Sequence, residues 1–188
     1  MRCFIAINLE KKLRADICRA TEPLRKTGAD VKWIDQENLH ITLKFLGKTT
    51  EERAYDLINV MGSKSLSHNA FEINLHGIGA FPDWRRPRVI WIGIVAPERL
   101  IRLHENVEEI AATLGYNRDK RAFLSHLTIG RVRSFNKIDS LMRAAGELKQ
   151  KNFGNIRAGR ISLMKSELKT GGAEYTTLSE FELNKEEQ

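Results

Sequence analysis

The sequence has little cysteine and no long apolar run, and these shortages exclude several classes of protein. Its 188 residues include only 2 cysteines, which are too few for a disulfide scaffold, and neither stands in a zinc-binding pattern. No apolar stretch approaches the roughly 18 residues that a membrane-spanning helix requires. The first residues, MRCFIAINLEKK, lack the apolar core and small-residue cleavage site of a secretory signal. We therefore expect a cytoplasmic protein.

Glycine and proline are also scarce, whereas apolar and charged residues are plentiful. The chain has 13 glycines and 4 prolines, against 41% hydrophobic and 29% charged residues, which excludes a fibrous or disordered chain. Its length suits one domain or two small lobes with a buried core. Lysine and arginine total 31 and the acidic residues 24, and the resulting net charge of +7 favours polyanionic partners without identifying one.

The spacing of the apolar residues predicts alternating strands and helices. Period-two patterns and short apolar runs indicate strands at 3–7, 39–46, 71–75, 88–95 and 125–132, followed by two late strands near 156–168 and 175–183. Apolar residues at helical spacing indicate helices from about residue 10 to 28, and at 49–61, 97–115 and 138–148. Pro23 is expected to kink or end the first of these helices.

Two stretches of the chain share one pattern. Residues 40–43 read His-Ile-Thr-Leu and residues 126–129 read His-Leu-Thr-Ile, so each has a histidine and a threonine separated by an apolar residue. Each stretch lies in a predicted strand that comes after another strand and a helix. The separation from Phe4 to His40 is nearly the same as that from Val89 to His126. Repeated supersecondary units bury their faces against each other. The repeat therefore predicts a duplicated, pseudo-twofold arrangement.

The paired motifs present imidazoles and hydroxyls that can act on one phosphate. Because residues i and i+2 of a strand share a face, His40 lies beside Thr42 and His126 beside Thr128. Histidine, with a pKa of about 6.5, exists in both protonation states near neutral pH, so one imidazole can accept a proton while the other donates one. Threonine hydroxyls can donate hydrogen bonds to phosphate oxygens. This chemistry suits an in-line displacement at phosphorus and needs no metal ion.

Other interpretations of the histidines compete with this one. A single His-x-Thr is typical of a histidine on an exposed strand, and the matched second copy is what favours catalysis. Two histidines also suit zinc, but a catalytic zinc site needs a third protein ligand, and Glu37 near His40 has no counterpart in the second half. We therefore expect no metal ion. His68, His76 and His104 are expected to be solvated.

At these motifs the chain resembles the two-histidine phosphoesterase superfamily and, within it, the RNA 2′,3′-cyclic phosphodiesterases, also called 2′-5′ RNA ligases. The resemblance is carried by MRCFIAINL, ENLHITLKFLG, GIGAFPDWRRPRVIWIGI, AFLSHLTIGRVRS and LMKSELKTGGAEYTTLSEF, which together span almost the whole chain. It implies an α+β fold: one bilobal, pseudo-twofold duplicated domain over residues 1–188, with two antiparallel β-sheets lining a central cleft and helices packed outside. The repeat halves would be roughly 1–85 with the C-terminal strands, and 86–150.

The resemblance also implies an activity, the hydrolysis of an RNA-terminal 2′,3′-cyclic phosphate to a 2′-phosphate without a cofactor. His40 then resembles the proton donor to the departing 3′ oxygen, His126 resembles the base that activates water, and Thr42 and Thr128 bind phosphate oxygens. The reverse reaction would join RNA ends through a 2′-5′ bond, with tRNA halves as the alternative substrate. The implied partner is RNA with a cyclic phosphate end, and we expect a monomer that binds no membrane. From a different class, the alternative is an RNA-end-binding or nucleotide-binding module without turnover.

Residues of the two motif strands are also predicted to bind substrate. Lys44 shares the polar face of its predicted strand with His40, whereas alternation turns Phe45, a further candidate, toward the core. Arg131 ends the second motif strand and can reach a phosphate. Alternation nevertheless places Arg131 on the face opposite His126, so a structural ion pair is an equal alternative.

Basic and aromatic residues alternate in the segment FPDWRRPRVIW. This pattern suits single-stranded RNA, because bases stack on aromatic rings and phosphates pair with arginine. Arg88 and Trp91 are the candidates from this segment, with core packing as the alternative for Trp91 because its strand is buried. Near the C-terminus, Tyr175 is predicted to stack on a base.

Overall fold

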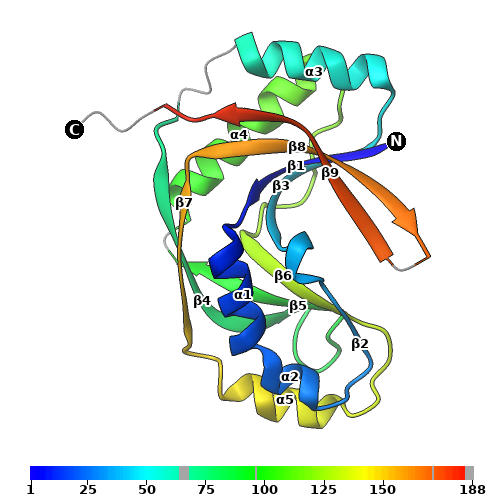
Figure 1. Cartoon of the computed structure of the whole chain (residues 1–188), viewed down its shortest axis with the longest axis vertical. Helices are drawn as coiled ribbons and strands as arrows, with labels where there is room; N and C mark the ends of the chain where they lie inside the picture. The colour runs from blue at the N-terminus through cyan, green and yellow to red at the C-terminus, as the bar shows by residue number, and fades with distance from the viewer. Residues whose placement is uncertain (64–67, 96, 171, 185–188) are drawn as a thin grey trace.

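The computed structural model describes residues 1–63, 68–95, 97–170 and 172–184, which fold into two antiparallel sheets (Figure 1). The four-stranded sheet has the order β3 (His40–Lys48), β1 (Arg2–Asn8), β8 (Arg160–Lys169), β9 (Gly172–Glu182). The five-stranded sheet has the order β2 (Val31–Trp33), β6 (His126–Val132), β5 (Val89–Val95), β4 (Phe71–Phe81), β7 (Asn152–Ala158). The two motif strands, β3 and β6, thus belong to different sheets, and they contact each other.

The helices pack on the outside of these sheets. They are α1 (Lys11–Ala20), α2 (Glu22–Lys26), α3 (Glu51–Ser63), α4 (Glu98–Thr113) and α5 (Ile138–Gly146), and a 3-10 turn, η1 (Gln36–Asn38), precedes β3. Helix α4 packs on β3 and α3 packs on α4, whereas α1 packs on β7 and α5 on β4 (Figure 1). Because α1 follows β1 and α4 follows β5, each of these two helices covers the sheet to which its preceding strand does not belong. None of the described helices is long and apolar enough to cross a membrane.

The predicted α+β architecture of two antiparallel sheets with outer helices is confirmed, with differences in detail. Pro23 lies in the first turn of the short helix α2, where the missing N–H of proline has no intrahelical partner to lose. The late part of the chain has three strands rather than two. Gly159 separates β7 from β8, and there the chain passes from the five-stranded to the four-stranded sheet. Strand β2 has only 3 residues, too short to produce a recognisable alternation.

Strand β1 is buried on both of its faces. Ile5 belongs to the main hydrophobic core, whereas Phe4, on the opposite face, packs with Met164 of β8 and with Tyr175 of β9. The rings of Phe4 and His40 lie 4.8 Å apart. The face of the four-stranded sheet that carries Phe4 is therefore also the face that presents the first motif histidine.

Each motif strand contains a β-bulge at the same place in its motif. The pairing of β3 with β1 skips Leu43, and the pairing of β6 with β5 skips Ile129. Leu43 and Ile129 are both the last residue of the four-residue motif. Since a bulge adds one residue to a strand, the residues directly after it turn to the face opposite to the predicted one.

Candidate active site

A backbone carbonyl two residues earlier in the chain orients each motif histidine. Nδ1 of His40 lies 2.7 Å from the carbonyl oxygen of Asn38, and Nδ1 of His126 lies 2.6 Å from that of Leu124. Because a carbonyl oxygen only accepts hydrogen bonds, each Nδ1 carries a proton. The two Nε2 atoms are therefore the atoms that can take up or release a proton, and the repeat holds both imidazoles in the same manner.

The threonine of the first motif lies beside its histidine, as predicted. Oγ1 of Thr42 is 3.1 Å from Nε2 of His40, so the hydroxyl donates to the neutral imidazole and accepts from the protonated one. In the second motif, Thr128 holds the matching position on β6 and pairs with Trp91 of β5. Each motif strand thus presents one imidazole and one threonine.

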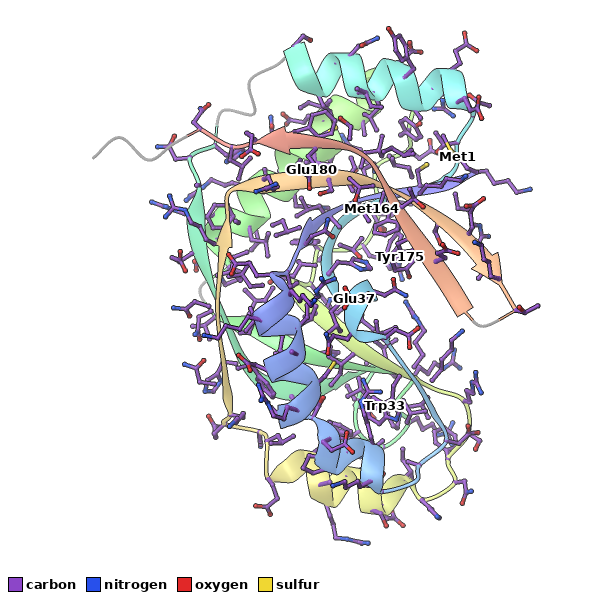
Figure 2. The ribbon with its side chains drawn as sticks, viewed as in Figure 1. Met1, Trp33, Glu37, Met164, Tyr175 and Glu180 are labelled. Atoms are coloured by element: carbon purple, nitrogen blue, oxygen red, sulfur yellow. The ribbon has the colours of Figure 1, made fainter. Side chains whose placement is uncertain are left out.

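An aromatic ring from another strand of the same sheet contacts each imidazole. The ring of Phe4 lies 4.8 Å from that of His40, and Tyr175 meets His40 edge-on at 5.3 Å. On the other sheet, Phe81 meets the ring of His126 edge-on at 4.9 Å. Tyr175 extends from β9 above the labelled Glu37 of η1 (Figure 2). The sequence patterns did not single out Phe4, which lies in an apolar run, or Phe81, which opens the segment FPDWRRPRVIW.

The bulge at Leu43 overturns the predicted orientations of Lys44 and Phe45. Lys44 does not share a face with His40, because its side chain is buried and its Nζ lies 2.6 Å from Oε1 of Glu108. Phe45 does not face the core, because it is 68% exposed and its ring lies 6.3 Å from Phe4 on the His40 face. The predicted contact of Lys44 with a phosphate is therefore wrong, whereas Phe45 lies where it can meet a ligand.

The second bulge turns Arg131 to the side of the histidines. Its side chain is exposed, and its positive charge lowers the pKa of His40, of His126 and of Tyr175. The charge of this one side chain thus acts on rings that belong to both sheets. The predicted placement opposite His126 is therefore wrong, since strict alternation fails at Ile129.

Both imidazoles bind protons more weakly than an exposed histidine. Burial lowers the pKa of His40 and of His126, and the charge of Arg131 lowers both further, against the opposing effect of the carbonyls that accept from Nδ1. Burial raises the pKa of the Tyr175 hydroxyl, which stays protonated. The neutral imidazole, which can accept a proton at Nε2, is thus favoured near pH 7.

We expect the variant Arg131→Gln to raise the pKa of both imidazoles, because removing a neighbouring positive charge stabilises the imidazolium ion. Nuclear magnetic resonance titration of the histidine side chains measures the two values separately. The variant Arg133→Gln, two residues further along the chain, is the control and should leave both unchanged. An increase at only one of the two imidazoles would contradict the effect of the Arg131 charge on both.

A cavity of about 840 Å³ opens beside His40. It lies between η1 and the β8–β9 hairpin, and its wall includes His40 and Tyr175 but not His126 or Thr128. The side-chain amide of Asn38 donates to the carbonyl oxygen of Ala173 at 2.9 Å and so ties η1 to the hairpin. Charged groups of both signs line the cavity, namely Arg14, Lys169, Asp35, Glu37 and Glu174. Nothing in the sequence indicated this cavity, because its walls come from segments far apart in the chain.

The two candidates from the basic and aromatic segment lie on the His126 side. The ring of Trp91 is 5.2 Å from Phe81, and a Cβ at Gly79 would lie 2.1 Å from the indole, so glycine makes room for this ring. Trp91 is partly exposed, unlike its neighbours Ile90 and Ile92, so it lies on the face of the site rather than in the core. Arg88 is exposed, and its backbone N–H donates to the carbonyl oxygen of Phe81 at 2.7 Å.

The described residues offer this site two imidazoles, two threonine hydroxyls and one guanidinium. Among the described residues, no group of three or more histidine, cysteine, aspartate or glutamate side chains is placed to hold a metal ion. Two imidazoles on contacting strands, each with Nδ1 bonded to a carbonyl and both subject to the charge of Arg131, suit a displacement at an anionic phosphorus centre.

Comparisons with known proteins agree with this geometry. A family model described as LigT like Phosphoesterase matches residues 7–91 and again residues 92–175. A protein of Methanothermobacter thermautotrophicus named RNA 2′,3′-cyclic phosphodiesterase is 35% identical over 183 residues, covering 97% of this chain and 99% of that one. A crystal structure of a protein from Thermus thermophilus matches at TM-score 0.81 with 28% identity over 100% of both chains. The crystal structure of Escherichia coli LigT complexed with 3′-AMP matches at TM-score 0.76 with 25% identity, covering 97% of each chain.

Proposed function

This chain belongs to the LigT-like phosphoesterase family, and from that premise we propose that it hydrolyses the 2′,3′-cyclic phosphate at the end of an RNA to a 2′-phosphate. The observation that carries the proposal is that His40 and His126, on the contacting strands β3 and β6, each have Nδ1 bonded to a backbone carbonyl, which leaves Nε2 for proton transfer. The relatives named RNA 2′,3′-cyclic phosphodiesterase supply the substrate class.

The reaction divides into two proton transfers at one phosphorus atom. Nε2 of His126 takes a proton from water, whose oxygen bonds to phosphorus while the bond from phosphorus to the 3′ oxygen breaks. His40 reacts as the imidazolium ion, and its Nε2 gives a proton to that departing oxygen, which leaves a 3′-hydroxyl and a 2′-phosphate. Because the pKa of His40 is lowered, this imidazolium ion is a stronger acid than that of an exposed histidine. Thr42, Thr128 and Arg131 hold the non-bridging oxygens, which carry the negative charge. Exchange of one proton with solvent at each imidazole restores the starting state.

The cavity supports the assignment of the proton donor to His40. The departing 3′ oxygen belongs to the terminal ribose, so the proton donor must face the nucleoside. The cavity that can receive a nucleoside borders His40, and the imidazole of His126 does not line it. Water, which needs no such cavity, then attacks from the side of His126. If the 5′ hydroxyl of a second RNA end takes the place of this water, the same two proton transfers give a 2′-5′ bond.

The aromatic rings around the site suit single-stranded RNA. Tyr175 lines the cavity and offers its ring to the terminal base, and the exposed Phe45 extends the same face. On the other side, Trp91 can stack on a neighbouring base and Arg88 can pair with a backbone phosphate. The partner is therefore RNA with a 2′,3′-cyclic phosphate end, processed by a cytoplasmic monomer. The joining of tRNA halves is the alternative outcome of the same chemistry.

A product assay in the presence of EDTA tests the proposal. We expect the purified protein to convert an oligoribonucleotide ending in a 2′,3′-cyclic phosphate into one ending in a 2′-phosphate, because protons and hydrogen-bond donors replace a metal ion. Loss of turnover in EDTA with recovery on adding a divalent metal would contradict metal independence. A longer strand as the main product would indicate ligation, and tight binding with unchanged RNA would indicate a binding module.

A further inference from the structure

A series of contacts behind the site connects the two motifs through helix α4. We infer that His104 is a positioning residue that fixes the strand of His40 relative to the loop that orients His126. The inference rests on the proposed function, and it concerns a residue outside the proposed acid–base pair. His104 was expected to be solvated, and that expectation is wrong, since its ring bonds to β3 and stacks on the loop after α4.

The first contact joins α4 to the bulge in β3. Nδ1 of His104 lies 2.8 Å from the carbonyl oxygen of Leu43, to which it donates a hydrogen bond. Leu43 is the extra residue of the bulge, where the regular hydrogen bonding between strands is interrupted, and its side chain is buried. A carbonyl of such a residue needs a donor from elsewhere. Because Leu43 directly follows Thr42, this bond holds the end of the first motif.

The second contact joins the same imidazole to the second motif. The ring of Phe123 stacks on that of His104, with centroids 4.0 Å apart and planes 7° from parallel. Phe123 is followed by Leu124, whose carbonyl oxygen accepts the hydrogen bond from Nδ1 of His126. A shift of Phe123 therefore moves the group that sets the orientation of the second imidazole. The side chain of His104 thus contacts both the bulge that ends the first motif and the loop that precedes the second.

A buried ion pair fastens the other end of the same loop. Glu108 lies one turn after His104 on α4, and its carboxylate bonds to Nζ of Lys44, the residue after the bulge. Nζ of Lys44 also donates to the carbonyl oxygen of Asn117 at 3.0 Å, and the N–H of Asp119 donates to Oε2 of Glu108 at 3.4 Å. The loop between α4 and β6 is thus tied to β3 at both ends.

These contacts matter because the two imidazoles belong to different sheets. No ladder of hydrogen bonds connects β3 to β6, so their relative position depends on side-chain contacts. In-line displacement requires both Nε2 atoms on one axis through phosphorus, and a misplacement of about 1 Å can lower a rate by about 100-fold. Through His104, helix α4 contacts both Leu43 of β3 and Phe123 of the loop that leads into β6.

Three substitutions at His104 separate its two contacts. His104→Phe removes the bond to Leu43 but retains a ring against Phe123, His104→Asn retains a donor but removes the stacking, and His104→Ala removes both. We expect kcat to fall about 10-fold in each of the first two and about 100-fold in His104→Ala, with KM nearly unchanged. The Nδ1–H resonances of His40 and His126, recorded on protein with isotope-labelled histidine, should shift in all three variants, and most in His104→Ala.

The exposed residue Glu105, next on the same helix, provides the control variant Glu105→Gln, which should match the unmodified protein. Folded His104→Ala with an unchanged kcat and unchanged imidazole resonances would overturn the inference. If His104→Ala does not fold, the same result in His104→Phe and His104→Asn would overturn it. Should the unmodified protein show no turnover, the proposed function fails, but the resonances still decide whether His104 positions the two imidazoles.

Discussion

Replacing either motif histidine by alanine should remove most of the turnover while leaving the fold intact. Each imidazole transfers one proton in the transition state, and a positioned acid or base contributes about 10²–10⁴-fold to a rate. We therefore expect kcat for the 2′,3′-cyclic RNA end to fall by that factor in His40→Ala and in His126→Ala. Quantifying the 2′-phosphate product over time measures the loss, and circular dichroism checks the fold.

A histidine elsewhere provides a matched control for these two variants. His68 precedes β4 and accepts a backbone hydrogen bond from Asn184 through its carbonyl oxygen, which His68→Ala retains. That variant should keep the activity of the unmodified protein. Near-full turnover in either His40→Ala or His126→Ala would show that the corresponding proton transfer has another source, and the acid–base assignment would be wrong.

The largest expected effect on stability follows from the buried pair of Lys44 and Glu108. Their side chains are 2% and 8% exposed, and Nζ lies 2.6 Å from Oε1. Lys44→Met leaves the carboxylate of Glu108 buried without its counter-ion, and breaking a buried ion pair in this way costs about 3–5 kcal/mol. We expect urea denaturation to show that decrease in the free energy of unfolding.

The double variant Lys44→Met/Glu108→Leu distinguishes the contribution of the ion pair to stability from the cost of a buried carboxylate without a counter-ion. Replacing both partners of a buried ion pair by apolar residues is often neutral for stability, so most of the loss should be recovered. A single variant Lys44→Met that unfolds at the same urea concentration as the unmodified protein would show that Glu108 finds another partner or becomes protonated without cost.

The periodic elements and the paired motifs could be predicted from the sequence, because both depend on local spacing. The alternation in HITLKFLG and the matched HLTI identify His40, Thr42, His126 and Thr128, and the structure places each of these on a motif strand. The hydrogen bonds of Nδ1 to the carbonyls of residues two positions earlier are equally local. They follow once a strand begins at the histidine.

The orientations beyond the motifs could not be predicted, because a β-bulge leaves no mark on the periodicity of one strand. Whether Leu43 or Ile129 is an extra residue depends on the pairing with a strand far away in the chain. The bulge at Leu43 reverses Lys44 and Phe45 relative to strict alternation, and the bulge at Ile129 reverses Arg131. The cavity beside His40 is unpredictable for the same reason, since it forms between η1 and a hairpin more than a hundred residues later.

The pH dependence of kcat/KM, measured for the unmodified protein and for the two alanine variants at His40 and His126, tests the central claim most directly. A base must be unprotonated and an acid protonated, so the unmodified protein should give a bell-shaped profile. His126→Ala should lose the rise on the acidic side and His40→Ala the decline on the alkaline side. A flat profile for the unmodified protein, or the loss of the same limb in both variants, would contradict the transfer of protons in opposite directions at one phosphate.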